Sequence, residues 1–141
     1  MTKYSLSIEA RLIEVRELKK WLTKIERSCS MTPKGVDKIE LALAEVCNNI
    51  IKHGYGEVGE TKSSFGIRLE AVVEQSTLKV SITDEAPEFN YEEDREIHID
   101  EPKIHGYGLM IVQKLTEKLT VRRINGQNVW NLVFPLEVFA S

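Results

Sequence analysis

The stretch LALAEVCNNIIKHGYG, residues 41–56, combines a helical apolar pattern with polar side chains at its edge. Glu45 and Asn49 lie one turn apart, so they share a face of the predicted helix. They border the apolar stripe, with the small residue Ala42 beside them. Two interpretations are open: a solvated helix flank, or a carboxylate and an amide oxygen directed into a cleft. The apolar stripe itself recurs every third or fourth residue: Ile39, Leu43, Val46 and Ile50.

The stretch ends in the tetrapeptide HGYG, which occurs again at residues 105–108 with unrelated flanking sequence. At the first copy, Gly54 follows a helical pattern, which predicts a helix end where positive φ is needed. At the second, Gly106 and Gly108 precede the apolar segment LMIVQKL and are expected at a helix beginning. Free N–H groups and the helix dipole favour anions there, and glycine admits a phosphate. A tight turn explains the same pattern.

The rest of the chain alternates between strand and helix periodicities. Strands are predicted at residues 3–8, 64–73, 77–84, 119–124 and 128–134. Helices are predicted at residues 9–27, 33–52 and 107–118, with Thr32-Pro33 as a typical helix start. Residues 85–106 are polar, acidic and without helical period, so a long loop is expected. This order predicts one α+β domain over residues 1–141, a two-layer sandwich of a mainly antiparallel sheet with helices on one face.

Asp84 occupies an unusual position in the segment TLKVSITDEA. The alternation of Leu78, Val80 and Ile82 places Asp84 next on the face that the sheet buries. A carboxylate buried there needs hydrogen-bond donors. The alternative is a strand that ends one residue earlier and leaves Asp84 in a solvated turn.

The composition excludes several classes of function. The chain has 141 residues, 42% of them hydrophobic and 29% charged, with a net charge of -3. This balance argues against nucleic acid or an anionic membrane as a partner, and no apolar run is long enough to span a bilayer. Cys29 and Cys47 form no CxxC pair, which indicates reduced thiols, and the N-terminus lacks a signal peptide. A cytoplasmic protein is expected.

Taken together, three segments resemble a known ATPase superfamily. LALAEVCNNIIKHGYG is similar to the asparagine box of the GHKL ATPases, in the form found in bacterial anti-sigma factor serine/threonine kinases. ITDEAPEFNY resembles the Asp-x-Gly box, and HGYGLMIVQKL the second glycine box. The resemblance covers nearly the whole chain and implies the Bergerat ATP-binding fold.

The resemblance also implies roles for individual residues. Glu45 would be the general base and Asn49 the ligand of Mg²⁺, which prefers hard oxygen donors. Asp84 would accept a hydrogen bond from the adenine amino group of ATP. Further nucleotide contacts are expected from residues of the two glycine-containing segments and the loop: His53, Ala86, Lys103, His105, Gly106, Tyr107, Gly108 and Leu109. Residues 85–106 would form the ATP lid.

Three positions depart from the family pattern. The glycine of the Asp-x-Gly box is Ala86 here, and a second glycine found in many relatives is Glu88. The last strand lacks the threonine usual near adenine and has Asn128. ATP affinity is therefore the property that these differences affect most directly.

The resemblance implies an anti-sigma factor that also acts as a kinase. Such a protein would bind a sigma factor, phosphorylate a STAS-domain anti-anti-sigma protein with ATP and form a homodimer. Two alternatives remain: a non-catalytic GHKL-fold binding module, and an ATPase that acts on no protein. The ATPase module of a sensor histidine kinase would need a phosphoacceptor histidine on a dimerisation helix, and His53, His98 and His105 are expected at helix ends or in loops.

Overall fold

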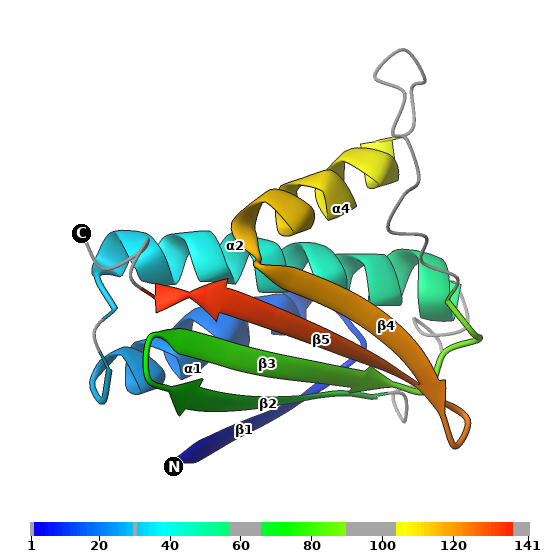
Figure 1. Ribbon diagram of the computed structural model, residues 1–141. Helices are drawn as coiled ribbons and strands as arrows, with labels where there is room; N and C mark the ends of the chain where they lie inside the picture. Colours follow the sequence, from blue (N-terminus) through cyan, green and yellow to red (C-terminus); the bar gives the residue numbers. More distant parts are fainter. Residues whose placement is uncertain (1, 30, 57–65, 90–103, 137–141) are drawn as a thin grey trace.

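The computed structural model describes residues 2–29, 31–56, 66–89 and 104–136 (Figure 1). Five strands form one sheet in the order β1-β2-β3-β5-β4, and every neighbouring pair is antiparallel. The strands are β1 (Lys3–Glu9), β2 (Gly66–Glu74), β3 (Thr77–Asp84), β4 (Lys118–Ile124) and β5 (Gln127–Pro135). The helices are the 3-10 helix η1 (Leu12–Arg16), α1 (Glu17–Glu26), α2 (Pro33–Asn49), the π-helix η2 (Ile50–Tyr55) and α4 (Ile104–Leu115).

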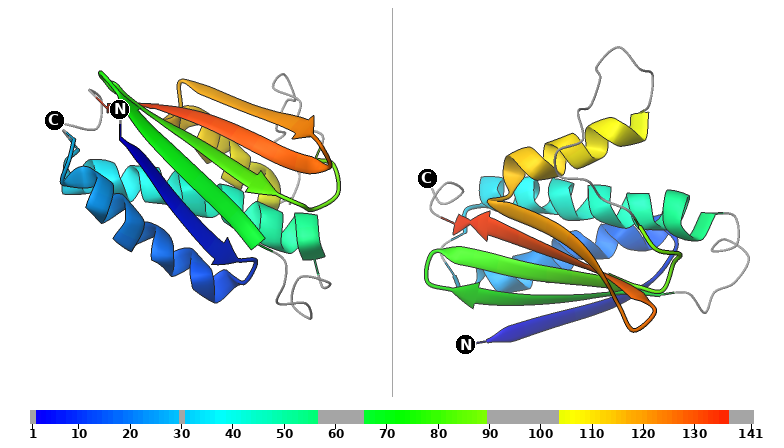
Figure 2. Two further views of the ribbon diagram at one scale, coloured as in Figure 1. Left: turned by 90° about the horizontal axis from the view of Figure 1, so that it is seen from below. Right: turned by 45° about the vertical axis from the view of Figure 1, so that its right-hand side comes forward.

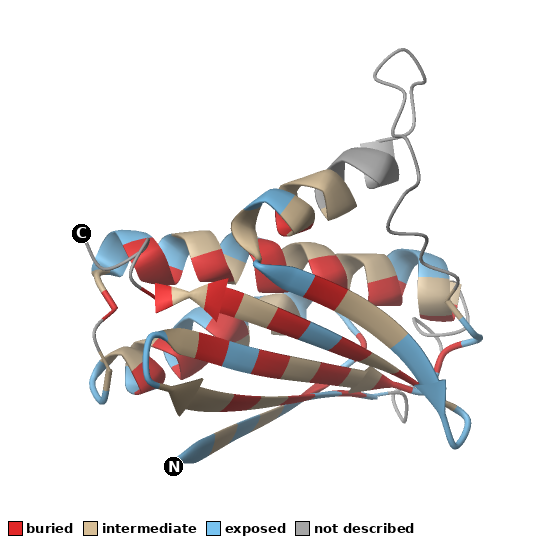
Figure 3. Ribbon diagram, viewed as in Figure 1, coloured by how far each residue is buried: buried red, intermediate tan, exposed pale blue. Residues whose placement is uncertain are grey.

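The helices pack on one face of the sheet, with α2 between α1 and α4 (Figure 2). Burial alternates along the strands, as expected when only one face meets the helices (Figure 3). On β3 the residues of the covered face are Leu78, Val80, Ile82 and Asp84, all at most 1% exposed. The predicted α+β sandwich with an antiparallel sheet and helices on one face is confirmed.

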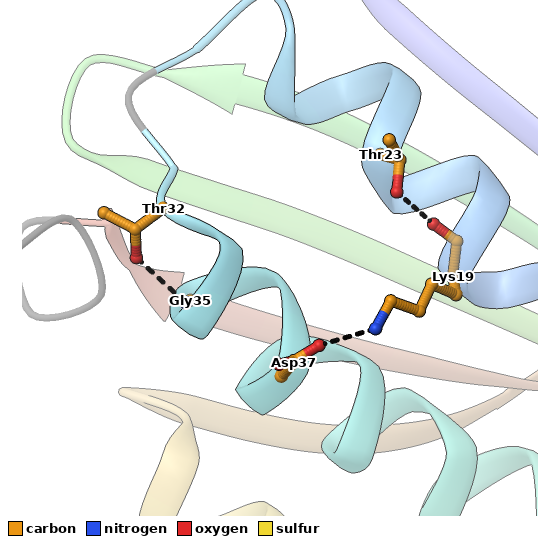
Figure 4. Close-up of polar contacts among 5 residues, drawn as sticks. All are labelled: Lys19, Thr23, Thr32, Gly35 and Asp37. Atoms are coloured by element: carbon orange, nitrogen blue, oxygen red, sulfur yellow. Dashed lines mark hydrogen bonds and ion pairs between the residues drawn. The ribbon is translucent and has the colours of Figure 1, made fainter.

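Helix α2 begins where the sequence predicts. Thr32 is the N-cap and its side chain accepts a hydrogen bond from the Gly35 N–H at 3.0 Å, while Pro33 needs no N–H in the first turn (Figure 4). Lys19 of α1 forms an ion pair with Asp37 of α2 at 2.9 Å (Figure 4). Both side chains are largely exposed, so the pair contributes little stability and mainly marks the flank of α2 that faces α1.

Three helix boundaries differ from the sequence-based predictions. The helix predicted at residues 9–27 is divided into η1 and α1; Leu12 and Ile13 are 48% and 58% exposed, so they do not extend the buried stripe. The second helix continues past Lys52 as η2, to Tyr55. The third occupies residues 104–115 instead of 107–118, because the chain from Lys118 onward pairs with β5.

Both hairpins of the sheet turn through two residues. Asn125 and Gly126 have φ values of 49° and 78°, as a type I′ turn requires, and Asn-Gly is the preferred sequence for it. The separate pairing of β5 with β3 places Asn128 directly opposite Asp84. None of the described helices is long and apolar enough to cross a bilayer.

Candidate nucleotide site

Asp84 ends β3 on the face of the sheet that the helices cover. The carboxylate is 1% exposed, which confirms the predicted inward orientation and excludes a solvated turn. It accepts hydrogen bonds from the Ala86 N–H (2.9 Å) and Asn128 Nδ2 (2.8 Å) at Oδ1, and from Trp130 Nε1 (3.0 Å) at Oδ2. The donors that a buried carboxylate needs therefore come from within the chain.

Asn128 lies beside Asp84 on β5 and is 2% exposed. Its Nδ2 group also donates to the Ala86 carbonyl (3.2 Å) and the Pro87 carbonyl (3.0 Å). Its Oδ1 accepts from the Phe89 N–H (3.0 Å) and from Arg123 Nη1 (3.3 Å). Asn128 thus binds both Asp84 and the segment that follows it.

The first residues after β3 are fixed by contacts with β4 and β5. Arg123 Nη1 donates to the Ala86 carbonyl at 2.7 Å, and the Phe89 ring packs on Trp130 with centroids 4.8 Å apart. Ala86 itself is 2% exposed. The sequence predicts one loop over residues 85–106, whereas residues 85–89 are held in place and residues 104–106 belong to α4. Residues 90–103, including Lys103, lie outside the described part of the chain.

The first HGYG copy joins the end of α2 to Asp84 and its neighbours. A Cβ at Gly54 would meet the Ala86 Cβ at 2.9 Å, so the absence of a side chain permits this close packing. The positive φ predicted for Gly54 occurs instead at Gly56, with φ 58°. Tyr55 donates its hydroxyl hydrogen to the Gly66 carbonyl (2.9 Å) and accepts from the Glu85 N–H (2.8 Å). This tyrosine connects the helix to β2 and β3.

The charge of Asp84 contributes to the raised pKa values of two nearby groups, Cys47 and Tyr55. Burial, and secondarily the Asp84 charge, raises the pKa of the Cys47 thiol to about 12. Burial also raises the pKa of Tyr55, and the charges of Asp84 and Glu85 act in the same direction. Cys47 is therefore a neutral, unreactive core thiol, and α2 and η2 both lie close to Asp84.

Glu45 and Asn49 are half-buried on the flank of α2. At about 100° per residue, they lie on the other side of the apolar stripe from Glu40 and α1, on the flank of the helix nearer α4 (Figure 2). Within the described residues, neither side chain has a hydrogen-bond or ion-pair partner. These two groups, which have no partner among the described residues, are available to a ligand, whereas three internal donors already bind Asp84.

The remaining predicted site residues lie on α4 and η2. Gly106, Tyr107 and Gly108 lie in the first two turns of α4, which begins three residues earlier than expected, so Gly106 still belongs to the turn whose N–H groups lack helical partners. Leu109 is half-buried and packs on the core. His53 is exposed on η2. Side chains of residues 104–108, His105 among them, lie outside the described part of the chain.

The sequence profile of the histidine kinase-like ATPase domain matches residues 8–134. The chain belongs to this family. Among curated proteins, this histidine kinase-like ATPase domain is 25% identical over 107 residues to the serine-protein kinase RsbW of Staphylococcus aureus, covering 70% of the chain and 65% of that protein. The RsbW serine-protein kinase of Halalkalibacterium halodurans is 25% identical over 103 residues, covering 67% and 60%. The chain thus spans less than two thirds of these relatives.

Solved structures share the fold. The crystal structure of the RsbU and RsbW domains of a Mycobacterium tuberculosis protein superimposes with a TM-score of 0.67 at 15% identity, covering 96% of this chain and 33% of that one. The histidine kinase domain of a blue-light activated histidine kinase from Erythrobacter litoralis gives a TM-score of 0.54 at 18% identity, covering 92% and 62%. At these identities the comparison establishes the architecture alone.

Three further residues contact Asp84 or the segment after it: Trp130, Arg123 and Tyr55. The sequence patterns predict none of these contacts, and Tyr55 stands out in them only as part of the repeated tetrapeptide. Trp130 lies two residues after Asn128, so both side chains point to the same, buried face of β5. An indole N–H on that face is the one feature of the sequence that indicates a buried hydrogen-bond donor. Nothing in the local sequence indicates that Arg123 or Tyr55 contacts the segment after β3.

Proposed function

We propose that the chain is an anti-sigma factor and serine/threonine protein kinase that binds a sigma factor. With ATP and Mg²⁺ it would phosphorylate a STAS-domain anti-anti-sigma protein, and it would act as a cytoplasmic homodimer. Membership of the histidine kinase-like ATPase domain family supports ATP binding. The similarity to proteins named serine-protein kinase RsbW supports the kinase activity and the partners that the sequence resemblance implies.

The observation that carries the proposal is the division of polar groups around the C-terminal half of α2. Asp84 is buried on the face of the sheet that the helices cover, and internal hydrogen bonds orient its carboxylate. Glu45 and Asn49 lie on the flank of α2 and have no side-chain partners among the described residues. An acceptor for the base of the nucleotide and open oxygen groups near its phosphates are what phosphoryl transfer needs.

The residues present suit magnesium. Mg²⁺ keeps most of its waters and takes one or two protein oxygens, so Asn49 Oδ1 suffices on the protein side. Magnesium bound there would neutralise charge on the transferred phosphoryl group. Glu45, one helical turn away, would accept the proton of the attacking serine or threonine hydroxyl. Asp84 would accept the hydrogen bond of the adenine amino group, and the N–H groups of the first turn of α4 would face the phosphates.

Comparison of Glu45→Ala with Asn49→Ala tests these roles. Loss of a positioned base typically costs about 10² to 10⁴ in rate, so Glu45→Ala should lose phosphoryl transfer while binding ATP normally. Sigma factor binding should persist as well. Asn49→Ala should weaken Mg-ATP binding itself. The measurements are transfer of labelled phosphate to a STAS-domain protein and nucleotide affinity by calorimetry.

Glu40→Ala is the matched control, because Glu40 is a half-buried glutamate on the other flank of α2, near Lys19. It should leave both phosphoryl transfer and ATP affinity unchanged. Wild-type transfer by Glu45→Ala, or equal loss in Glu40→Ala, would contradict the assignment of Glu45 as the base.

A second candidate function is a non-catalytic module that binds protein partners. The observation in its favour is that internal groups already occupy most of the Asp84 environment: three internal donors reach the carboxylate, and Ala86 packs against Gly54. Calorimetry with Mg-ATP separates the two functions. Sigma factor binding by a protein that binds no ATP would favour this alternative.

A further inference from the structure

Asn128 is bound to its surroundings through both ends of its carboxamide. Nδ2 faces three acceptors, the Asp84 carboxylate and the carbonyls of Ala86 and Pro87. Oδ1 faces two donors, the Phe89 N–H and Arg123 Nη1. Nδ2 shares its two hydrogens among these three acceptors. Only this orientation of the carboxamide fits the surrounding groups, because a flipped side chain would oppose acceptor to acceptor and donor to donor.

These contacts determine what remains available on Asp84. An ionised carboxylate offers about four acceptor positions, two on each oxygen. Asn128 and the Ala86 N–H fill both positions of Oδ1, and Trp130 fills one of Oδ2. Among the residues that the structure describes, no donor fills the remaining acceptor position on Oδ2, and its direction is set by the bonds that hold the other three.

The same side chain holds the backbone that follows β3. Asn128 donates to two carbonyls of residues 86–89 and accepts from the N–H of Phe89, in the same segment. Arg123 also donates to the Ala86 carbonyl, so the position of this segment depends on both side chains. Buried polar networks of this kind, with every member paired, favour one arrangement over all others. The segment is therefore ordered by the protein itself.

We propose that Asn128 is a positioning residue of the nucleotide site with two separable roles. It orients the Asp84 carboxylate so that one acceptor position on Oδ2 meets the ligand's amino group, and it fixes residues 86–89 without help from a ligand. The first role rests on the proposed function, since it requires that Asp84 contacts the nucleotide. The second role stands without it.

A matched pair of substitutions separates the two roles. Threonine and valine have nearly the same shape and both suit a strand, but only threonine retains a hydroxyl that can donate to Asp84. Neither can replace the carboxamide's bonds to residues 86–89. Asn128→Val should weaken ATP binding roughly tenfold to a hundredfold, as expected when a buried polar group loses its partner. Asn128→Thr should stay within about threefold of the wild type.

Selectivity between ATP and inosine triphosphate is the readout that a purely structural role would not change. Inosine carries an oxygen where adenine has its amino group, so an oriented Asp84 should reject it. The preference for ATP should shrink in Asn128→Val and persist in Asn128→Thr. Amide exchange at Phe89 should accelerate in both variants, since both lose the Oδ1 acceptor.

Two further measurements keep the outcomes distinct. If Asp84→Asn binds ATP as the wild type does, the site assignment of the proposed function is overturned, and the first role of Asn128 with it. If Asp84→Asn loses ATP but Asn128→Val retains affinity and preference, only the role of Asn128 is overturned. Should Asn128→Val fail to fold, nucleotide-free wild-type protein decides the second role: slow exchange at Ala86 and Phe89 supports it, and fast exchange refutes it.

Discussion

The two HGYG copies share four residues and differ in structural setting. In the first, Gly54 packs against Ala86, Tyr55 bridges β2 and the segment after β3, and Gly56 adopts positive φ where η2 ends. In the second, the backbone runs straight through the first turns of α4. The same tetrapeptide therefore ends one helix and begins another. The structural role of a glycine motif depends on the element that precedes or follows it.

The comparison also separates residues that stabilise the fold from residues expected to contact the ligand. The first copy makes its contacts within the protein. His105, Gly106 and Tyr107 of the second copy lie in the first turn of α4, whose N–H groups have no helical partner, which suits phosphate oxygens. Substitutions at the two copies should accordingly affect different measurements.

Gly54→Ala should have the largest effect on stability. The new Cβ would lie 2.9 Å from the Ala86 Cβ, closer than two carbon atoms can approach, so the backbone must shift. Overpacking of this kind costs about 1–3 kcal/mol of unfolding free energy, measurable as a lower denaturant midpoint.

A double-mutant cycle sharpens this prediction. Ala86→Gly removes the opposing methyl group, so the double variant Gly54→Ala/Ala86→Gly should recover most of the lost stability. Additive effects of the two substitutions would show that the contact between these residues does not explain the glycine.

Gly108→Ala should affect ligand binding and leave the fold intact. Alanine favours a helix by up to about 1 kcal/mol relative to glycine, so stability should be equal or higher. If the backbone there approaches the phosphates, the methyl group should lower ATP affinity by roughly tenfold. A variant that loses stability as Gly54→Ala does would remove the distinction between the two copies.

Tyr55→Phe should have the smallest effect, about 1 kcal/mol, because water can replace the hydroxyl at the exposed residues Gly66 and Glu85. The pKa of Tyr55 is raised in the folded state, chiefly by burial. Its contribution is therefore complete below the unfolded value near 10 and is lost as pH rises through the folded value. Wild-type stability should fall more steeply with pH than that of Tyr55→Phe as the pH rises above about 10. Parallel pH profiles would contradict this linkage.

The sequence alone determined the architecture and the inward position of Asp84. Alternation along residues 77–84 places every second side chain on one face, and the period of Ile39, Leu43 and Val46 defines the buried side of α2. These patterns are local, so they can be read without knowing what packs against them. The asparagine and glycine boxes identified the family for the same reason.

Tertiary structure alone decided which groups satisfy Asp84 and which glycine is sterically required. Asn128 and Trp130 are more than forty residues away along the chain and reach Asp84 only because β5 pairs with β3 in one register. The place of Gly54 after a helix predicts a positive φ, yet Gly54 makes a close contact with Ala86, and the positive φ belongs to Gly56. Helix periodicity says nothing of the opposing surface, and a hydrogen bond between distant strands depends on register, which the whole sheet sets.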